Sequence, residues 1–139
     1  MEKKTRLKRR ILIIAVVLIA VTGVVLAAKT ALSKMESNLE GLMQLDVTDV
    51  DLKSISDGTY IGEYSALPVS AKVSVSIKDH RITNIDLLEH NNGQGAGAEV
   101  IPLIVVEKQT LQIDTISGAT YSSKVILKAI EDALQNSTK

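Results

Sequence analysis

The chain has 139 residues, with 16 basic and 16 acidic side chains and no Cys, Phe or Trp, so it cannot form a disulfide or carry a lipid-modified cysteine anchor. This length predicts one domain with appended segments. Residues 29–139 hold 10 basic and 15 acidic residues, a net charge of −5, which together with the few aromatic side chains argues against a nucleic-acid partner.

A basic segment and then an apolar one begin the chain. Residues 1–10 contain six basic residues and one acidic residue, and residues 11–28, ILIIAVVLIAVTGVVLAA, contain no charge. As an α-helix these 18 residues span about 27 Å, close to the ~30 Å hydrocarbon core of a bilayer. Since basic residues beside a span stay cytoplasmic, we expect a single-pass protein of the cell membrane whose C-terminal domain is extracytoplasmic.

A cleaved signal peptide is the alternative to this anchor. Cleavage after Ala28 would place Leu26 at the −3 position, where a small residue is usual. Cleavage after Ala27 would place Val25 there, which is tolerable. We favour an uncleaved anchor.

Residues 29–55 are interpreted as a stalk. Apolar residues including Leu32, Met35, Leu39 and Leu42 recur there at helical spacing. Asp49 and Asp51 then mark a change to an extended segment. A plain spacer is the favoured reading of this stretch.

A small sheet is predicted next. Asp57-Gly58 indicates a turn before a strand at 59–64, and residues 71–78 alternate strictly between apolar and polar, which is typical of a half-buried strand. Asp79-His80 predicts a turn to a returning strand at 81–88, although that turn lacks its usual glycine.

The remaining elements are mostly helical. Residues 90–97, HNNGQGAG, predict a loop, and residues 98–109 predict a helix with Pro102 in its first turn. A brief strand is expected at 111–113 and an amphipathic helix at 122–134. The predicted fold class is α+β, a small antiparallel sheet with segregated helices, preceded by one N-terminal transmembrane helix.

Several familiar kinds of site are excluded by spacing. The sequence GQGAG at 93–97 lacks the G-x-G-x-x-G pattern and the βαβ setting of a dinucleotide site. The two histidines, His80 and His90, have no metal-ligand spacing, and no G-x-S-x-G or nucleophilic cysteine indicates a hydrolase. His80 is expected to be solvated.

The segment 114–123, DTISGATYSS, precedes the last predicted helix. A helix N-terminus offers free backbone N–H groups and a positive dipole end, which suit a phosphate group. Gly118 and Ala119 would let a bulky group approach the backbone. Thr120 is predicted as the N-cap, and such a cap needs no further function.

The pattern D-x-x-S-G-A-T, followed by Tyr-Ser-Ser and an amphipathic helix, resembles the covalent flavinylation motif of the FMN-binding domain family. That family includes the extracytoplasmic C subunit of Na⁺-translocating NADH:quinone reductase, the G subunit of related ferredoxin-linked complexes, and small membrane-anchored flavoproteins. The resemblance covers residues 49–135, including DGTYIG at 57–62, the alternating strand and the glycine loop.

This resemblance implies a modified threonine. In the family the last threonine of the motif carries FMN through a phosphoester, which here is Thr120. Asp114 matches the acid needed for recognition by a Mg²⁺-dependent flavin transferase that uses FAD as FMN donor. The E-T-P-G-x-G loop of the subunit-type members corresponds to residues 90–95, where only the glycines match. The expected cofactor-binding residues are Thr120, Ser117, Gly118, Ala119, Tyr121, Ser122, Ser123, Asp114, Tyr60, Gly93 and Gly95.

The expected function is electron transfer by a membrane-anchored flavoprotein without substrate turnover of its own. Its expected partners are the flavin transferase, redox partners at the membrane and the lipid bilayer. Two alternatives remain open, an interaction module in which the motif only caps a helix, and a protein that binds FMN noncovalently. The predicted organisation is a cytoplasmic basic segment (1–10), a transmembrane anchor (11–28), a stalk (29–55), an FMN-binding domain (56–135) and a tail (136–139).

Overall fold

The structure is a computed structural model that describes the backbone of residues 2–137 and the side chains of residues 7–137. It contains two compact units, residues 1–36 and 37–139. Part of the predicted basic segment, Lys3, Lys4 and Arg6, and the last two residues of the predicted tail lie outside the described side chains. The predicted domain boundaries themselves stay predictions.

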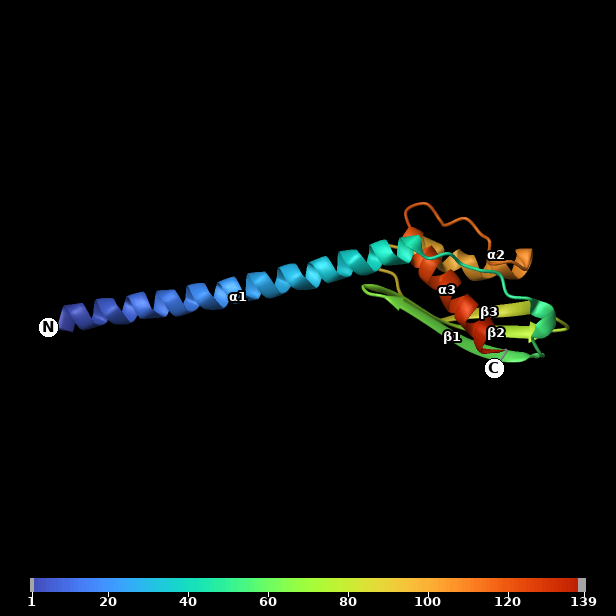
Figure 1. Ribbon diagram of the computed structural model, residues 1–139, viewed down its shortest axis with the longest axis horizontal. Helices are drawn as coiled ribbons and strands as arrows, with labels where there is room; N and C mark the ends of the chain where they lie inside the picture. Colours follow the sequence, from blue (N-terminus) through green and yellow to red (C-terminus); the bar gives the residue numbers. More distant parts are fainter. Residues whose placement is uncertain (1, 138–139) are drawn as a thin grey trace. The chain divides into compact units, whose positions relative to one another are not determined.

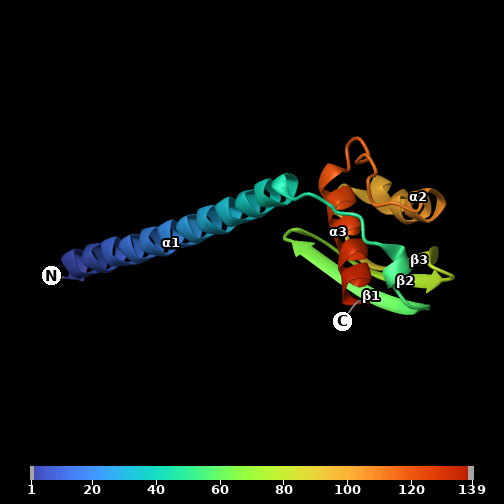
Figure 2. The ribbon, with the colours of Figure 1, turned by 45° about the vertical axis from the view of Figure 1, so that its right-hand side comes forward.

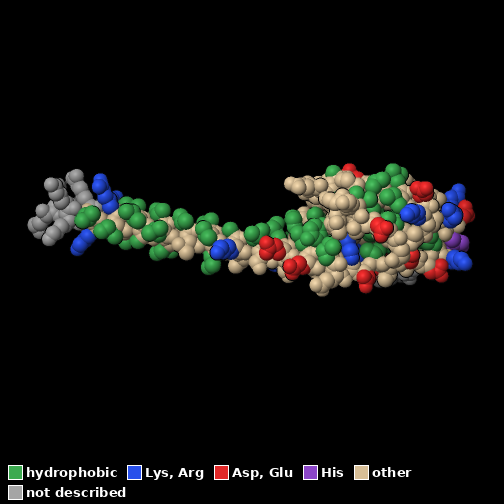
Figure 3. All heavy atoms as spheres, turned by 90° about the horizontal axis from the view of Figure 1, so that it is seen from above, with side chains coloured by type: hydrophobic (Ala, Val, Ile, Leu, Met, Phe, Trp, Pro, Cys, Tyr) green, Lys and Arg blue, Asp and Glu red, His purple; other side chains and the backbone are tan. Residues whose placement is uncertain are grey.

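The first unit consists of most of a long helix, α1 (Glu2–Gln44). Its Leu, Ile and Val side chains between residues 11 and 26 are exposed, and Figure 3 shows them as a hydrophobic surface with basic side chains near its N-terminal end. Among the described residues, α1 is the one helix long and apolar enough to cross a bilayer, although a signal sequence meets the same criterion.

The second unit is built on a three-stranded antiparallel sheet in the order β1-β2-β3 (Figure 1). The strands are β1 (Gly58–Ala66), β2 (Val69–Lys78) and β3 (Arg81–Asn91). The predicted alternation of β2 is confirmed, because Val73 and Val75 are buried while Ser74 between them is not. The predicted hairpin is also confirmed.

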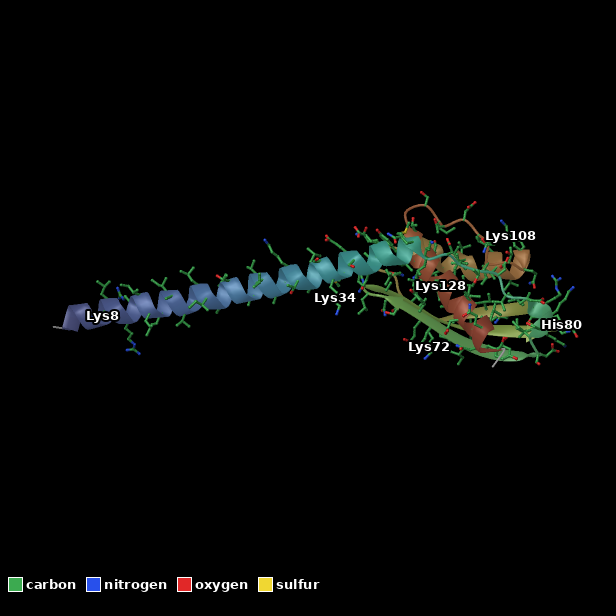
Figure 4. The ribbon with its side chains drawn as sticks, in the orientation of Figure 1. Lys8, Lys34, Lys72, His80, Lys108 and Lys128 are labelled. Atoms are coloured by element: carbon green, nitrogen blue, oxygen red, sulfur yellow. The ribbon has the colours of Figure 1, made fainter. Side chains whose placement is uncertain are left out.

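The turn of this hairpin, Asp79-His80, forms without a glycine. Asp79 and His80 both have positive φ, 51° and 58°, as a two-residue type I′ turn requires. The backbone N–H of Asp79 donates to the carboxylate of Asp57 at 2.9 Å, so the first residue of the DGTYIG segment fastens the turn. His80 is exposed at the turn (Figure 4), as expected for a solvated histidine.

The helices of this unit lie on one face of the sheet (Figures 1 and 2). Helix α3 (Thr120–Asn136) packs against β1 and β2, and α2 (Ile101–Lys108) packs against β3. Two short 3-10 helices, η1 (Leu52–Ser54) and η2 (Ala96–Val100), complete the elements. Pro102 occupies the first turn of α2, as predicted. The α+β fold class is confirmed.

The predicted strand at 111–113 is wrong, since this segment pairs with no strand among residues 2–137. Side chains hold it instead. The carboxylate of Asp49 accepts from the N–H of Leu111 at 2.5 Å and from the hydroxyl of Thr110 at 2.7 Å, and the side chain of Gln112 donates to the carbonyl of Val47. The apolar residues that suggested a strand instead place Leu111 in the core.

The backbone of helix α3 lies very close to the sheet at Gly62. A Cβ atom at this position would lie 2.1 Å from the carbonyl oxygen of Ala129 and 2.3 Å from the backbone nitrogen of Ala133. Real atoms do not approach so closely, so any side chain here would push α3 away from β1. Gly62 therefore sets the distance between the helix and the strand.

We predict that Gly62→Ala lowers the free energy of unfolding by about 1–3 kcal/mol, because the added methyl group overpacks a backbone contact. Gly58→Ala is the matched control, since a Cβ there meets only the side chain of Tyr60, at 3.2 Å. Denaturant unfolding of both variants in detergent checks this. Equal stability of the two variants would contradict the close packing.

A buried carboxylate fastens α3 to the segment that follows α1. Glu131 is 3% exposed and accepts a hydrogen bond from the hydroxyl of Thr48 at 2.5 Å, while Lys128 forms an ion pair with it. Burial alone would raise the pKa of Glu131, but the hydrogen bonds from Lys128 and Thr48 and the charge of Lys128 outweigh it and lower the pKa.

This lowered pKa predicts an acid-sensitive contribution to stability. The ionised Glu131 stabilises the fold at neutral pH, and that contribution is lost as the pH falls below about 4.5 through the folded-state pKa. The difference in unfolding free energy between the wild type and Glu131→Gln should therefore shrink on acidification. Unfolding measured from pH 7 downward in about half-unit steps checks this, and a constant difference would contradict it.

Candidate functional site

A cavity of about 300 Å³ lies at the N-terminus of α3. Three parts of the second unit line it: the glycine loop 92–95, the motif residues 118–122, and an apolar edge formed by Leu39, Pro68 and Val69. This volume is at the lower end of the range for small-molecule sites. The cavity thus joins two segments that the sequence singled out separately, the glycine loop and the S-G-A-T motif.

The glycine loop is seated directly on the first turn of α3. A Cβ atom at Gly95 would lie 2.2 Å from the hydroxyl oxygen of Ser122, so only glycine permits this contact. The carbonyl of Asn92 accepts from the N–H of Gly95 at 2.7 Å and from the hydroxyl of Ser122 at 3.4 Å. Gly93 has a φ of 57°, in the left-handed region that favours glycine.

A second set of hydrogen bonds that shapes the loop involves His90. Its Nδ1 lies 3.1 Å from the carboxylate of Glu99, which also accepts from the side chain of Asn92 at 3.2 Å. These hydrogen bonds, with that of His90 first, lower the pKa of Glu99. His90 thus contributes to the shape of the loop rather than to a metal site, and the described residues contain no cluster of metal-ligating side chains.

The S-G-A-T motif is shaped by the buried serine that follows it. The hydroxyl of Ser123 accepts from the N–H of Ile116 at 3.0 Å and donates to the carbonyl of Ala119 at 2.9 Å. Gly118 has a φ of 77°, which lets the chain turn sharply into the helix. The two hydrogen bonds close this turn from inside the fold.

The predicted N-cap role of Thr120 is wrong. Ala119 occupies the N-cap position and no side chain of residues 7–137 caps α3, so Thr120 is the first residue of the helix. The reason is that Ser123 and the left-handed Gly118 already close the turn one residue earlier. Within the described part of the chain, the first N–H groups of α3 therefore have no side-chain cap. They form the positive end of the helix dipole, at the place where the cavity lies.

The five hydroxyl groups of Ser and Thr in residues 114–123 have different surroundings. Ser122 and Ser123 are 1% and 0% exposed and are hydrogen-bonded. Ser117 is exposed and Thr115 lies beside another cavity. Thr120 is half-buried, lines the cavity at the start of α3, and forms no side-chain hydrogen bond with the described residues.

The other predicted site residues are divided between two places. Tyr121, which is 41% exposed, lines the same cavity as Thr120. Asp114 is exposed and lines a different cavity, of about 360 Å³, with Thr115 and Lys124. Tyr60 is not brought to the site: it stands near the opposite end of β1 from Pro68, and its hydroxyl donates to the carbonyl of Ser56 at 2.9 Å.

Sequence reasoning missed the apolar edge of the cavity. Leu39 falls in the predicted stalk, and no role is predicted for Pro68. Nothing in the local pattern distinguishes Leu39 from the other apolar residues at helical spacing in the stalk. Only the tertiary fold shows that it reaches the cavity.

Comparison with known proteins identifies the class of this site. Residues 68–135 match the FMN-binding domain family, so about half of the chain is similar to that family. The matched range contains the glycine loop and the whole S-G-A-T motif. The match supports a flavin-binding role for this part of the chain.

A curated relative supports this assignment over a similar length. Urocanate reductase from Eggerthella lenta is 35% identical over 68 residues, which cover 47% of this chain and 11% of the relative. The chain therefore matches only a small part of that larger protein. No solved structure matches the chain.

The geometry of the motif predicts unequal roles for two of its serines. Ser123→Ala should lower the free energy of unfolding by about 1–3 kcal/mol, because it leaves the half-buried N–H of Ile116 without its Ser123 partner. Ser117→Ala, at the exposed serine of the same motif, should change stability little. Thermal unfolding of the two variants checks this, and equal melting temperatures would count against the described turn.

Proposed function

We propose that this protein carries FMN covalently on Thr120, in an extracytoplasmic domain anchored to the cell membrane by α1, and transfers electrons between redox partners at the membrane surface. The single observation that carries the proposal is the position of Thr120. It combines a hydroxyl that forms no hydrogen bond with the described side chains, a cavity beside it, and an N-terminus of α3 that none of those side chains caps.

The residues around Thr120 fit the phosphate end of FMN. Gly118 has open space where a Cβ would stand, and so has Gly93 across the cavity. A phosphate on the Thr120 oxygen would meet the free N–H groups and positive end of α3, which stabilise a negative charge. When bound, FMN supplies the redox chemistry, and the protein supplies its position and surroundings.

The attachment reaction is a transfer from FAD by a flavin transferase. The Thr120 hydroxyl oxygen forms a bond to the phosphorus of the FMN half, the bond from that phosphorus to the bridging oxygen breaks, and AMP leaves with the hydroxyl proton. Asp114 is proposed as a recognition residue for the transferase. Its exposure on the loop before the motif supports access from outside.

Membrane anchoring supports the choice of a covalent cofactor. A flavin that dissociates outside the cell is lost, whereas a phosphoester keeps it without a deep pocket, and the cavity is small. The basic side chains before residue 11 favour a cytoplasmic N-terminus. Anchoring also raises the effective concentration of the flavin near membrane redox partners, which suits a carrier without a substrate of its own.

The covalent bond is tested by co-expressing the protein with a flavin transferase and viewing a denaturing gel under ultraviolet light. The wild type should fluoresce at the mass of the chain, and Thr120→Val should not. Thr115→Val is the matched control, because it removes the other threonine hydroxyl of the motif and should keep the fluorescence.

Two other results would contradict the proposal. A native yellow protein that loses its flavin on the gel would indicate noncovalent FMN binding. A wild-type chain that stays colourless in the presence of the transferase would favour an interaction module without flavin.

A further inference from the structure

We infer that the last turns of α1, through Leu39, form an apolar wall of the flavin site, so that the helix leading from the membrane is itself part of the cofactor site. This inference rests on the proposed FMN attachment to Thr120. Leu39 lies 29 residues before the range that matches the family, which begins at residue 68, and it lines the same cavity as Thr120.

The end of α1 is anchored in the core of the second unit. Leu42, three residues after Leu39, is 1% exposed, and Leu39 itself packs against the core with part of its surface free. A helix places residues three apart on the same face. The burial of Leu42 therefore orients Leu39 toward the domain rather than toward solvent.

Helix α3 holds this wall by its own side chains. The ammonium group of Lys124 donates to the carbonyl of Met43 at 3.2 Å and to the carbonyl of Leu45. Met43 lies in the last turn of α1, and Leu45 directly follows the helix. One turn later, Lys128 donates to the carbonyl of Asp46 at 3.5 Å. These cations also suit the negative end of the α1 dipole. The helix that begins with Thr120 thus fixes the segment that faces it.

The cavity has two chemically different sides. The glycine loop and the start of α3 present backbone groups, which suit the phosphate and ribityl part of FMN. Leu39, Pro68 and Val69 present aliphatic surface, which suits the flat apolar face of the isoalloxazine ring. Because burial of apolar surface is favourable, this side favours the ring and excludes water from one of its faces.

The inference is tested on the full-length flavinylated protein in detergent by iodide quenching of flavin fluorescence. Leu39→Ala should give a larger Stern–Volmer constant than the wild type, because iodide and water reach the uncovered ring face. Met43→Ala is the matched control on the same helix, since Met43 is 43% exposed and does not line the cavity. It should quench like the wild type.

A tryptophan scan gives a second measurement that does not depend on removing a core contact. The chain contains no Trp, and an indole touching a flavin quenches its emission. Leu39→Trp should therefore lose most of its flavin fluorescence in the native state and regain it on denaturation, whereas Met43→Trp should stay bright throughout.

These outcomes separate the inference from the proposed function. If wild-type protein carries covalent flavin but substitutions at Leu39 and Met43 behave alike in both measurements, the wall is overturned while Thr120 attachment stands. If the wild type carries no covalent flavin, the proposed function fails first. Equal flavin fluorescence of all variants on the denaturing gel shows that loading is the same, so that a difference in quenching supports the wall.

Discussion

The position of α3 on the sheet is the constraint on which the site depends. Gly62 lets the backbone of α3 touch β1, with no room for a Cβ between them, and the buried face of α3 includes Ile126, Ile130 and Leu134. Helix α3 is consequently held along its length, and its N-terminus has one position relative to the strands. Because Thr120 is the first residue of α3, the packing of this helix also fixes the position of the site.

Each remaining part of the site is held in place by contacts with α3. The glycine loop rests on Ser122 through Gly95, the S-G-A-T turn is closed by Ser123, and the end of α1 is held by Lys124. One helix therefore supplies the proposed attachment point, Thr120, the hydroxyl of Ser122 that contacts the glycine loop, and the ammonium group of Lys124 that holds the end of α1. A small domain gains a defined site in this way without a deep pocket.

Regular patterns in the sequence predicted much of this fold, whereas contacts made by individual side chains were not predicted. The alternation of residues 71–78 predicts β2 because one face of the sheet is buried, and the apolar stripe of 122–134 predicts α3. The strand expected at 111–113 failed because side chains of Asp49 and Gln112 replace a backbone ladder there. Thr120 was expected as a cap because local sequence does not reveal that Ser123 closes the turn. The role of Leu39 depends on a contact distant in sequence, which no local pattern encodes.

A phosphoester at Thr120 is tested most directly by tandem mass spectrometry of the protein co-expressed with a flavin transferase. Trypsin cleavage after Lys108 and Lys124 releases residues 109–124, a single peptide with every Ser and Thr of the motif. We predict that this peptide gains the mass of FMN less one water, and that fragment ions place this added mass on Thr120. Modification of another residue, or an unmodified peptide in the presence of an active transferase, would contradict attachment of FMN to Thr120.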